Sequence, residues 1–295
     1  MRNETLPQVD LIKDILSFEL KKRSLGKPIQ VVSDFDETQC STYIFSKHWN
    51  THVPKIRTDL FQEAQRLVQP MCIATARTPT EYVSWVIWHK LSCLPMPLVA
   101  ENGAVLVWPS ARITEQPKVE VLATDEQIWT INKIQRELQT GLINNFSVPI
   151  EHEIVLRPGR VATIEIRAQE KQSKNGTPGD YSVITSQLRE MFADHLRHIE
   201  IVSSGNSLGI QPKGVCKETG IRAALANAGI NPADVFLVGI GDNKNDASLF
   251  SFIRQNGGFA IGVKQEAEGL ADLVINQGDE ATLQILRVVN SLCRS

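Results

Sequence analysis

Short, mainly apolar runs that lead into polar residues are the feature that most constrains the fold of this chain. One run covers 29–32 and stops at Ser33 and Asp34; a second, 71–73, stops at Ala74 and Thr75. The segment between them, 59–69, has apolar residues at helical spacing behind Asp59, a suitable N-cap. Strand, helix and strand in this order predict a parallel βαβ unit, and hence an α/β fold.

The rest of the chain divides into two kinds of pattern. The α/β alternation holds to about 108 and returns after Gly214, whereas the segment between them has the mixture of helices and antiparallel strands typical of a separate α+β module. We therefore expect a discontinuous domain of 1–108 and 212–295, with a module of 109–211 inserted in it. The other elements expected are helices at 1–25, 80–91, 125–142, 181–196, 214–228, from 247 and from 280, and strands at 97–100, 104–108, 161–167, around 205–206, 235–240 and 258–261, with a polar surface loop at 170–180.

Composition excludes several classes of partner. The formal charge of −2 gives no electrostatic reason to expect nucleic acid or an anionic membrane, and no stretch approaches membrane-spanning length. Five widely spaced cysteines without a C-x-x-C pair fit neither a disulfide framework nor a thiolate zinc site, and the N-terminus lacks the apolar core of a signal peptide. These features predict a cytoplasmic protein, and they leave its oligomeric state open.

The polar residues at the predicted strand ends form the candidate site. Ligands of an open parallel sheet bind beyond the carboxyl ends of its strands, where loops converge. The residues there are Asp34, Asp36, Thr38, Thr75, Arg77, Asp242, Asn245 and Asp246. Carboxylates gathered so closely repel one another unless a cation lies among them, and an oxygen-only ligand set favours Mg²⁺, which commonly bridges to phosphate.

Taken together, these residues resemble the motifs of the haloacid dehalogenase-like (HAD) phosphatase superfamily. The motifs are Asp34-Phe-Asp36-Glu-Thr38, then Thr75, then Lys213, then Gly241-Asp242-Asn-Lys-Asn-Asp246, and they occur in the order of the superfamily. The insert, with Glu101-Asn-Gly103 before it and Pro212-Lys213-Gly214 after it, resembles the type IIB cap of the Cof-like and sucrose-phosphate phosphatase branch. The resemblance implies a Rossmann-like core domain with an α+β cap; trehalose-phosphate phosphatases are ranked lower because their fourth motif usually differs.

The resemblance also implies roles for individual residues. Asp34 would be the nucleophile that becomes an aspartyl-phosphate, and Asp36 the acid that protonates the leaving oxygen and later deprotonates water. Thr75, Lys213 and Asn245 would contact the phosphate. Mg²⁺ would be held by Asp34, the backbone carbonyl of Asp36, and Asp242, with Asp246 acting through water or orienting Lys213.

Substrate selection is less constrained by these patterns. Glu37 and Ala76 depart from the residues usual in the branch, and neither would donate a catalytic atom. Cap residues facing the core are expected near 157–160, Glu165 and 203–206, where arginines would suit a second anionic group and Glu165 and Asn206 sugar hydroxyls. Three aromatic side chains after the first motif are expected to line the substrate pocket under the cap: Tyr43, Phe45 and Trp49.

We therefore expect a Mg²⁺-dependent phosphatase acting on a small phosphorylated metabolite, most simply a sugar phosphate. Asp36 argues against a dehalogenase, which has no leaving alcohol to protonate. A phosphosugar mutase and a non-catalytic sugar-phosphate-binding protein remain alternatives. Singly, each motif has a structural explanation, since Asp34, Asp36 and Thr75 could cap helices and Lys213 could be a solvated surface residue.

Overall fold

A computed structural model describes residues 6–36, 38–40, 43–46, 51–54, 57–81, 96–108, 117–141, 146, 152–170, 181–203 and 207–293. At its centre is a parallel five-stranded sheet in the order β14-β13-β12-β1-β4. Its strands are β1 (Ile29–Ser33), β4 (Cys72–Ile73), β12 (Phe236–Gly241), β13 (Phe259–Gly262) and β14 (Leu273–Val274). The predicted α/β class and the parallel pairing of the first two buried strands are confirmed.

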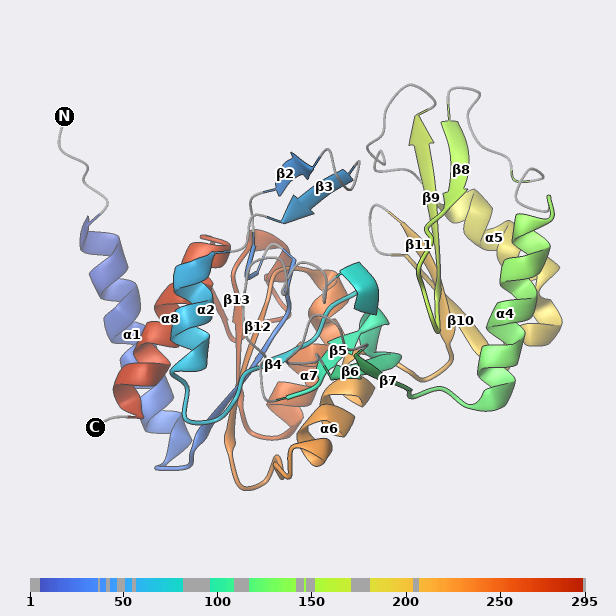
Figure 1. Cartoon of the computed structure of the whole chain (residues 1–295). Helices are drawn as coiled ribbons and strands as arrows, with labels where there is room; N and C mark the ends of the chain where they lie inside the picture. Colours follow the sequence, from blue (N-terminus) through green and yellow to red (C-terminus); the bar gives the residue numbers. More distant parts are fainter. Residues whose placement is uncertain are drawn as a thin grey trace.

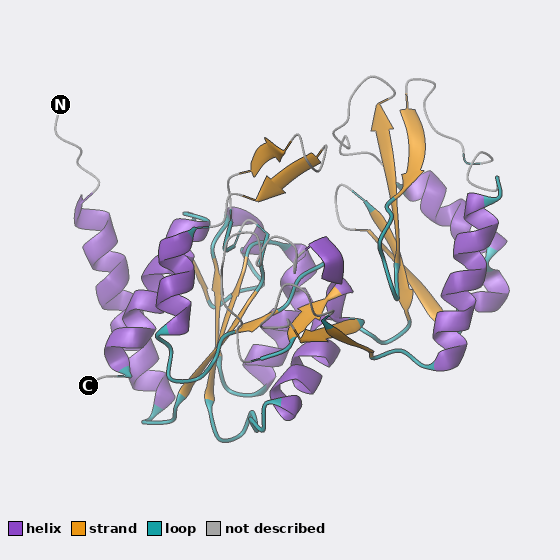
Figure 2. Ribbon diagram, viewed as in Figure 1, coloured by secondary structure: helices purple, strands orange, loops and turns teal. Residues whose placement is uncertain are grey.

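Helices cover both faces of this sheet (Figures 1 and 2). They are α1 (Leu6–Ser24), α2 (Thr58–Gln65) and α8 (Asp279–Leu292) on one face, and α6 (Lys217–Asn227) and α7 (Ala247–Gln255) on the other. Strand side chains alternate between the two faces, so neighbouring residues enter different cores. Val31 and Val238 belong to the cluster beneath α1 and α8, whereas Val32 and Leu237 belong to the one beneath α6 and α7.

A smaller sheet continues the core beside β4. It contains β5 (Leu98–Ala100), β6 (Val105–Trp108) and β7 (Lys118–Val121) in antiparallel order, and a parallel bridge from Ala74 to Val99 joins it to the end of β4. A further hairpin, β2 (Tyr43–Ser46) and β3 (Thr51–Pro54), follows β1 along the chain. We did not predict this hairpin or β7 from the sequence.

The cap is the antiparallel sheet β10-β11-β9-β8 with two helices packed on it (Figure 1). Its strands are β8 (His152–Leu156), β9 (Ile164–Glu170), β10 (Ile199–Ser203) and β11 (Leu208–Pro212), and its helices are α4 (Asp125–Gln139) and α5 (Ser182–Met191). These elements share a hydrophobic core that is separate from the two beneath the parallel sheet. The division at 108/109 and 211/212 stays a prediction; β7 lies beyond the first boundary but pairs with β6.

Most expected elements are present with shifted ends. The helix expected from Asp59 begins at Thr58 behind Arg57, and the strand expected at 161–167 starts at Ile164. Several expectations fall outside the described residues: the helix at 80–91 beyond residue 81, the loop at 171–180, and the positions Glu37, Trp49 and 204–206. Of the described helices, none combines the length and the hydropathy needed to cross a membrane.

Candidate active site

The ends of β1 and β12 bring the first and last motifs together. These strands are parallel neighbours with Ser33 opposite Ile240, and the backbone N–H of Asp34 donates to the carbonyl of Ile240 at 2.8 Å. Asp34 and Asp242 therefore leave the sheet side by side, as predicted from their places at strand ends. Both are buried, with 5% and 4% of their surface exposed.

A buried lysine joins the two motifs, and it is not the lysine that we predicted. The Nζ of Lys217 lies 2.6 Å from Asp34 Oδ1 and 2.6 Å from Asp246 Oδ1. Its side chain is 4% exposed, and Lys217 is the first residue of α6. Burial alone would lower the pKa of Lys217, but the charges of Asp246 and Asp34 outweigh it, so the pKa is raised and the ammonium stays protonated.

The assignment of Lys213 to the site was wrong. Lys213 is exposed at the end of β11, where its Nζ donates to the carbonyl of Leu196 at 3.2 Å. The Lys-Gly pair at 213–214 matched the family pattern, but two residues, Val215 and Cys216, separate it from the helix, which begins at Lys217. The signal that separates the two lysines is the exact start of the helix, which local propensity does not locate to within a few residues.

Asp246 owes its position to a close approach by the backbone. Its Oδ2 accepts from the N–H of Asp242 at 2.9 Å and from the N–H of Asn243 at 3.3 Å. A Cβ at residue 241 would lie 2.6 Å from that oxygen, so only glycine lets the carboxylate fold back over the strand end. Asp246 Oδ1 accepts from Lys217 and not from Lys213, the lysine that we expected it to orient, and its role toward the cation stays a prediction.

The three buried carboxylates fit a hard cation. One oxygen each of Asp34, Asp242 and Asp246 lie within 4.8 Å of one another. Asp242 Oδ1 is buried and has no hydrogen-bond partner among the described residues, which is costly unless another ligand takes it up. An oxygen-only set of this kind suits Mg²⁺, and Asp34, Asp242 and Asp246 are the residues that would hold it.

Two carboxyl groups of this cluster, those of Asp34 and Asp242, resist ionisation in the absence of a cation. Burial raises the pKa of Asp34 well above its usual value; the Lys217 charge opposes this, and the neighbouring carboxylates add to it. Burial and the charge of Asp246 raise the pKa of Asp242 to about 7. A divalent cation would reverse both shifts, since it stabilises the ionised forms.

Asp36 lies beside this cluster, and its carboxylate is held by Arg77. The guanidinium reaches both oxygens, with Nε 2.8 Å from Oδ1 and 2.9 Å from Oδ2. Arg77 follows Thr75 in one loop, which we call the phosphate loop (75–77). Thr75 is buried, and its Oγ1 accepts from the N–H of Arg77 at 3.1 Å. We noted Arg77 in the sequence as a strand-end residue, without predicting this role.

The predicted phosphate contact of Asn245 has no counterpart among the contacts of the described residues. Asn245 is exposed, and its backbone N–H donates to Asn243 Oδ1 at 2.7 Å; no contact in the described part of the chain ties its side chain to Asp34, so its phosphate contact stays a prediction. Gln39 was missed: it is buried and its Nε2 donates to the carbonyl of Asp34 at 2.8 Å. Nothing in its spacing distinguished it from a core residue.

Of the cap residues predicted to face the core, Arg157 and Arg160 contact it, whereas the carboxylate of Glu165 pairs with arginines of the cap, so its role stays a prediction. Three arginines, Arg157, Arg160 and Arg167, surround Glu165. Burial would raise the pKa of Glu165, but the three arginine charges outweigh it and lower the pKa to about 2. Arg157 also pairs with Glu81 and Arg160 with the carbonyl of Ala76, so these arginines are engaged by the protein itself.

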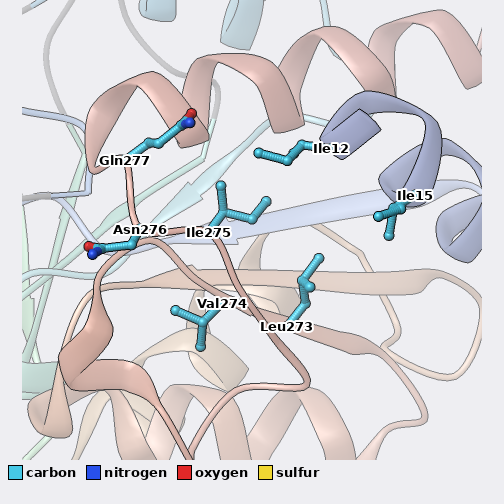
Figure 3. A pocket seen from close by; sticks show the side chains of 7 residues that line it. All are labelled: Ile12, Ile15, Leu273, Val274, Ile275, Asn276 and Gln277. Atoms are coloured by element: carbon cyan, nitrogen blue, oxygen red, sulfur yellow. The ribbon is translucent and has the colours of Figure 1, made fainter. Parts of the chain in front are cut away.

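The hollow shown in Figure 3 is remote from these residues. It holds about 350 Å³ between α1 and the segment 273–277, and Ile12, Ile15 and Ile275 are among its lining residues. None of the residues lining it belongs to the predicted site. Its lining is mainly aliphatic, with the amides of Asn276 and Gln277 and no titratable side chain, so we do not assign it to the reaction.

Comparison with known proteins supports the fold. A family model described as haloacid dehalogenase-like hydrolase matches residues 31–281. A search of curated proteins finds no match. Among solved structures, the C-terminal domain of trehalose-6-phosphate phosphatase from C. albicans is 12% identical with a TM-score of 0.65, covering 95% of this chain and 96% of that one.

Two more solved structures have the same fold. A putative HAD/COF-like hydrolase from Plasmodium vivax is 17% identical with a TM-score of 0.62, covering 94% of this chain and 99% of that one. Trehalose-6-phosphate phosphatase from Aspergillus fumigatus is 14% identical with a TM-score of 0.57, covering 95% and 97%. The likeness spans the parallel sheet and the cap together.

Proposed function

Because this chain belongs to the haloacid dehalogenase-like hydrolase family, we propose that it is a Mg²⁺-dependent phosphatase with Asp34 as its nucleophile. The family predicted from the motifs is confirmed by the match over 31–281. The observation that carries the proposal is the buried bridge of Lys217 between Asp34 and Asp246, at 2.6 Å to each. It supplies an ammonium where a phosphate and a carboxylate have to approach each other.

In the first step, a carboxylate oxygen of Asp34 attacks phosphorus and the bond from phosphorus to the ester oxygen breaks. The leaving oxygen takes a proton from Asp36, and the phosphoryl group stays on Asp34 as an acyl phosphate. Lys217 offsets the repulsion between the anionic nucleophile and the anionic phosphate. Thr75, on the neighbouring strand end, would donate its hydroxyl to a phosphoryl oxygen.

In the second step, water attacks the phosphorus of the acyl phosphate. Asp36, now ionised, takes a proton from that water, and the bond from phosphorus to the Asp34 oxygen breaks to release inorganic phosphate. Arg77 orients the Asp36 carboxylate between the steps through its contacts to both oxygens. When bound, Mg²⁺ would neutralise phosphate charge.

We propose a sugar phosphate as the substrate. The likeness to trehalose-6-phosphate phosphatases is one of fold, and it supports a phosphorylated sugar because those proteins carry a comparable core and cap. Arg157 and Arg160 contact the core from the cap, and Glu165 pairs with both, so these are the cap residues that would meet a sugar extending from the phosphate.

The test is phosphate release from p-nitrophenyl phosphate and from a panel of sugar phosphates, with Mg²⁺ and with EDTA. We expect Asp34→Asn to lower kcat by about a thousandfold or more, since the nucleophile is lost. Asp234→Asn, on an exposed turn near β12, is the matched control and should retain activity. Equal inactivity of wild type and Asp34→Asn on every substrate would sink the proposal.

A further inference from the structure

Glu101 is a buried acidic residue that the reaction above does not use. It is fully buried, and both of its carboxylate oxygens accept hydrogen bonds from the segment between β8 and β9. We call this segment the cap turn (157–163). The donors are the N–H of Val161 at 2.7 Å, the N–H of Ala162 at 3.0 Å and Thr163 Oγ1 at 2.8 Å. The cap thus donates the hydrogen bonds that a buried carboxylate needs, although Glu101 itself belongs to the turn between β5 and β6.

The backbone of Glu101 contacts the phosphate loop at the same time. Its N–H donates to the carbonyl of Arg77 at 3.0 Å, and the N–H of Asn102 donates to the carbonyl of Thr75 at 3.0 Å. Both Glu101 and Asn102 have positive φ, at 48° and 56°, a conformation that costs about 1 kcal/mol or more for a residue with a Cβ. A strained conformation kept between two sets of hydrogen bonds indicates that the surroundings fix it.

The cap turn contacts the phosphate loop at a second point. Arg160 Nη1 donates to the carbonyl of Ala76 at 3.0 Å, and Ala76 lies between Thr75 and Arg77. Arg157 pairs with Glu81, just after the same loop. The loop is therefore held from the core side by the backbone of Glu101 and from the cap side by the turn that the Glu101 side chain binds.

We propose that Glu101 is a positioning residue of the phosphatase site, whose carboxylate seats the cap turn against the phosphate loop. The role rests on the proposed function. These contacts hold Thr75 and Arg77 in fixed positions relative to the cap. A leaving group that extends from the phosphate toward the cap therefore contacts both residues in one defined geometry. Glu101 itself touches no reacting atom.

The experiment combines hydrogen exchange with kinetics for Glu101→Ala and Glu101→Gln. In Glu101→Ala, the amides of Val161 and Ala162 should exchange at least about tenfold faster, since their acceptor is gone. We expect kcat on p-nitrophenyl phosphate to fall about ten- to a hundredfold while KM changes by less than about threefold, because misplaced groups affect the reacting geometry. Glu101→Gln, which keeps one acceptor oxygen, should retain part of the amide protection and part of kcat that Glu101→Ala loses.

Glu218→Ala is the matched control, because Glu218 pairs with its helix neighbour Arg222 on the surface of α6, at 2.9 Å. It should change neither exchange in the cap turn nor kcat. Thr163→Val, which removes one bond and leaves the carboxylate, replaces Glu101→Ala if that variant does not fold, and should lower kcat about twofold to fivefold.

Two outcomes overturn the positioning role alone: unchanged exchange of the two amides in Glu101→Ala, or faster exchange with wild-type kcat. An inactive wild type would instead overturn the proposed function, and the positioning role with it. A Glu101 variant that loses thermal stability yet keeps its kcat per folded molecule would show that the contact between Glu101 and the cap turn is only structural.

Discussion

The ammonium of Lys217 lies between two carboxylates from different strand ends, and this single side chain links the motifs into one site. Removing it would leave Asp34 and Asp246 buried with no counter-charge, which costs about 3–5 kcal/mol for a broken buried pair. The same removal would take away the positive charge that offsets the approach of the phosphate. Stability and rate should therefore both depend on it.

A comparison of Lys217→Met with Lys213→Met tests this assignment. We expect Lys217→Met to lower kcat about a hundredfold or more, and Lys213→Met to stay within about twofold of wild type because its ammonium is exposed. Phosphate release is measured on samples whose folding has been checked by circular dichroism. Comparable losses in the two variants would contradict the geometry of the site.

At the scale of elements, the turn 101–103 and the start of α6 pack backbone to backbone. A Cβ at Gly103, whose φ is +101°, would lie 1.9 Å from the carbonyl oxygen of Cys216, the residue that precedes Lys217. Only glycine permits this approach. The turn that binds the cap through Glu101 thus also fixes where the helix bearing Lys217 begins.

Gly103→Ala should therefore destabilise the protein by about 3 kcal/mol, from overpacking and from the positive φ together. Gly229→Ala is matched in backbone conformation, with a φ of +70°, but its Cβ would meet nothing within 4 Å, so we expect a loss of only about 1 kcal/mol. Urea unfolding monitored by fluorescence gives both values. Equal losses would mean that the contact with Cys216 does not matter.

The elements that the sequence predicted well are those in which pattern and burial agree. β1 and β12 are β-branched runs with polar ends, and their place in a parallel sheet followed from that pattern. β7 and β8 were missed, since β7 carries charged residues on a half-exposed strand and β8 opens with the polar residues His152 and Glu153. To choose Lys217 over Lys213, the start of the helix has to be known to within a few residues. Local propensity does not give that precision.

At the scale of the whole molecule, the raised pKa of Asp242 couples the stability of the fold to pH and to cation binding. Its folded pKa is about 7 without a cation, whereas an unfolded Asp has its ordinary value of 3.8. Between these values the folded protein binds more protons than the unfolded chain, so stability from this group is present at low pH and is lost as pH rises through about 7. A bound cation should remove this loss, because it binds the ionised form.

We therefore expect Mg²⁺ to raise Tm more at pH 8 than at pH 5.5. At a hundred times its Kd, a ligand adds about 2.7 kcal/mol, which corresponds to roughly 5–10 °C for a chain of this size. Differential scanning fluorimetry with and without Mg²⁺ at both pH values measures the shift. Asp242→Asn should abolish most of it, and a Tm increase equal at both pH values would contradict the linkage.

The salt bridge between Asp34 and Lys217 spans 183 residues of sequence. At typical rates of synthesis, roughly 10–40 s pass after Asp34 leaves the ribosome before Lys217 follows it. β1 must also wait for its central partner β12, since the two are joined only when the last part of the chain has been made. During that interval the hydrophobic edge of β1 is unpaired, and Asp34 lacks its counter-charge. We therefore expect chaperones to protect the growing chain most at this stage of synthesis.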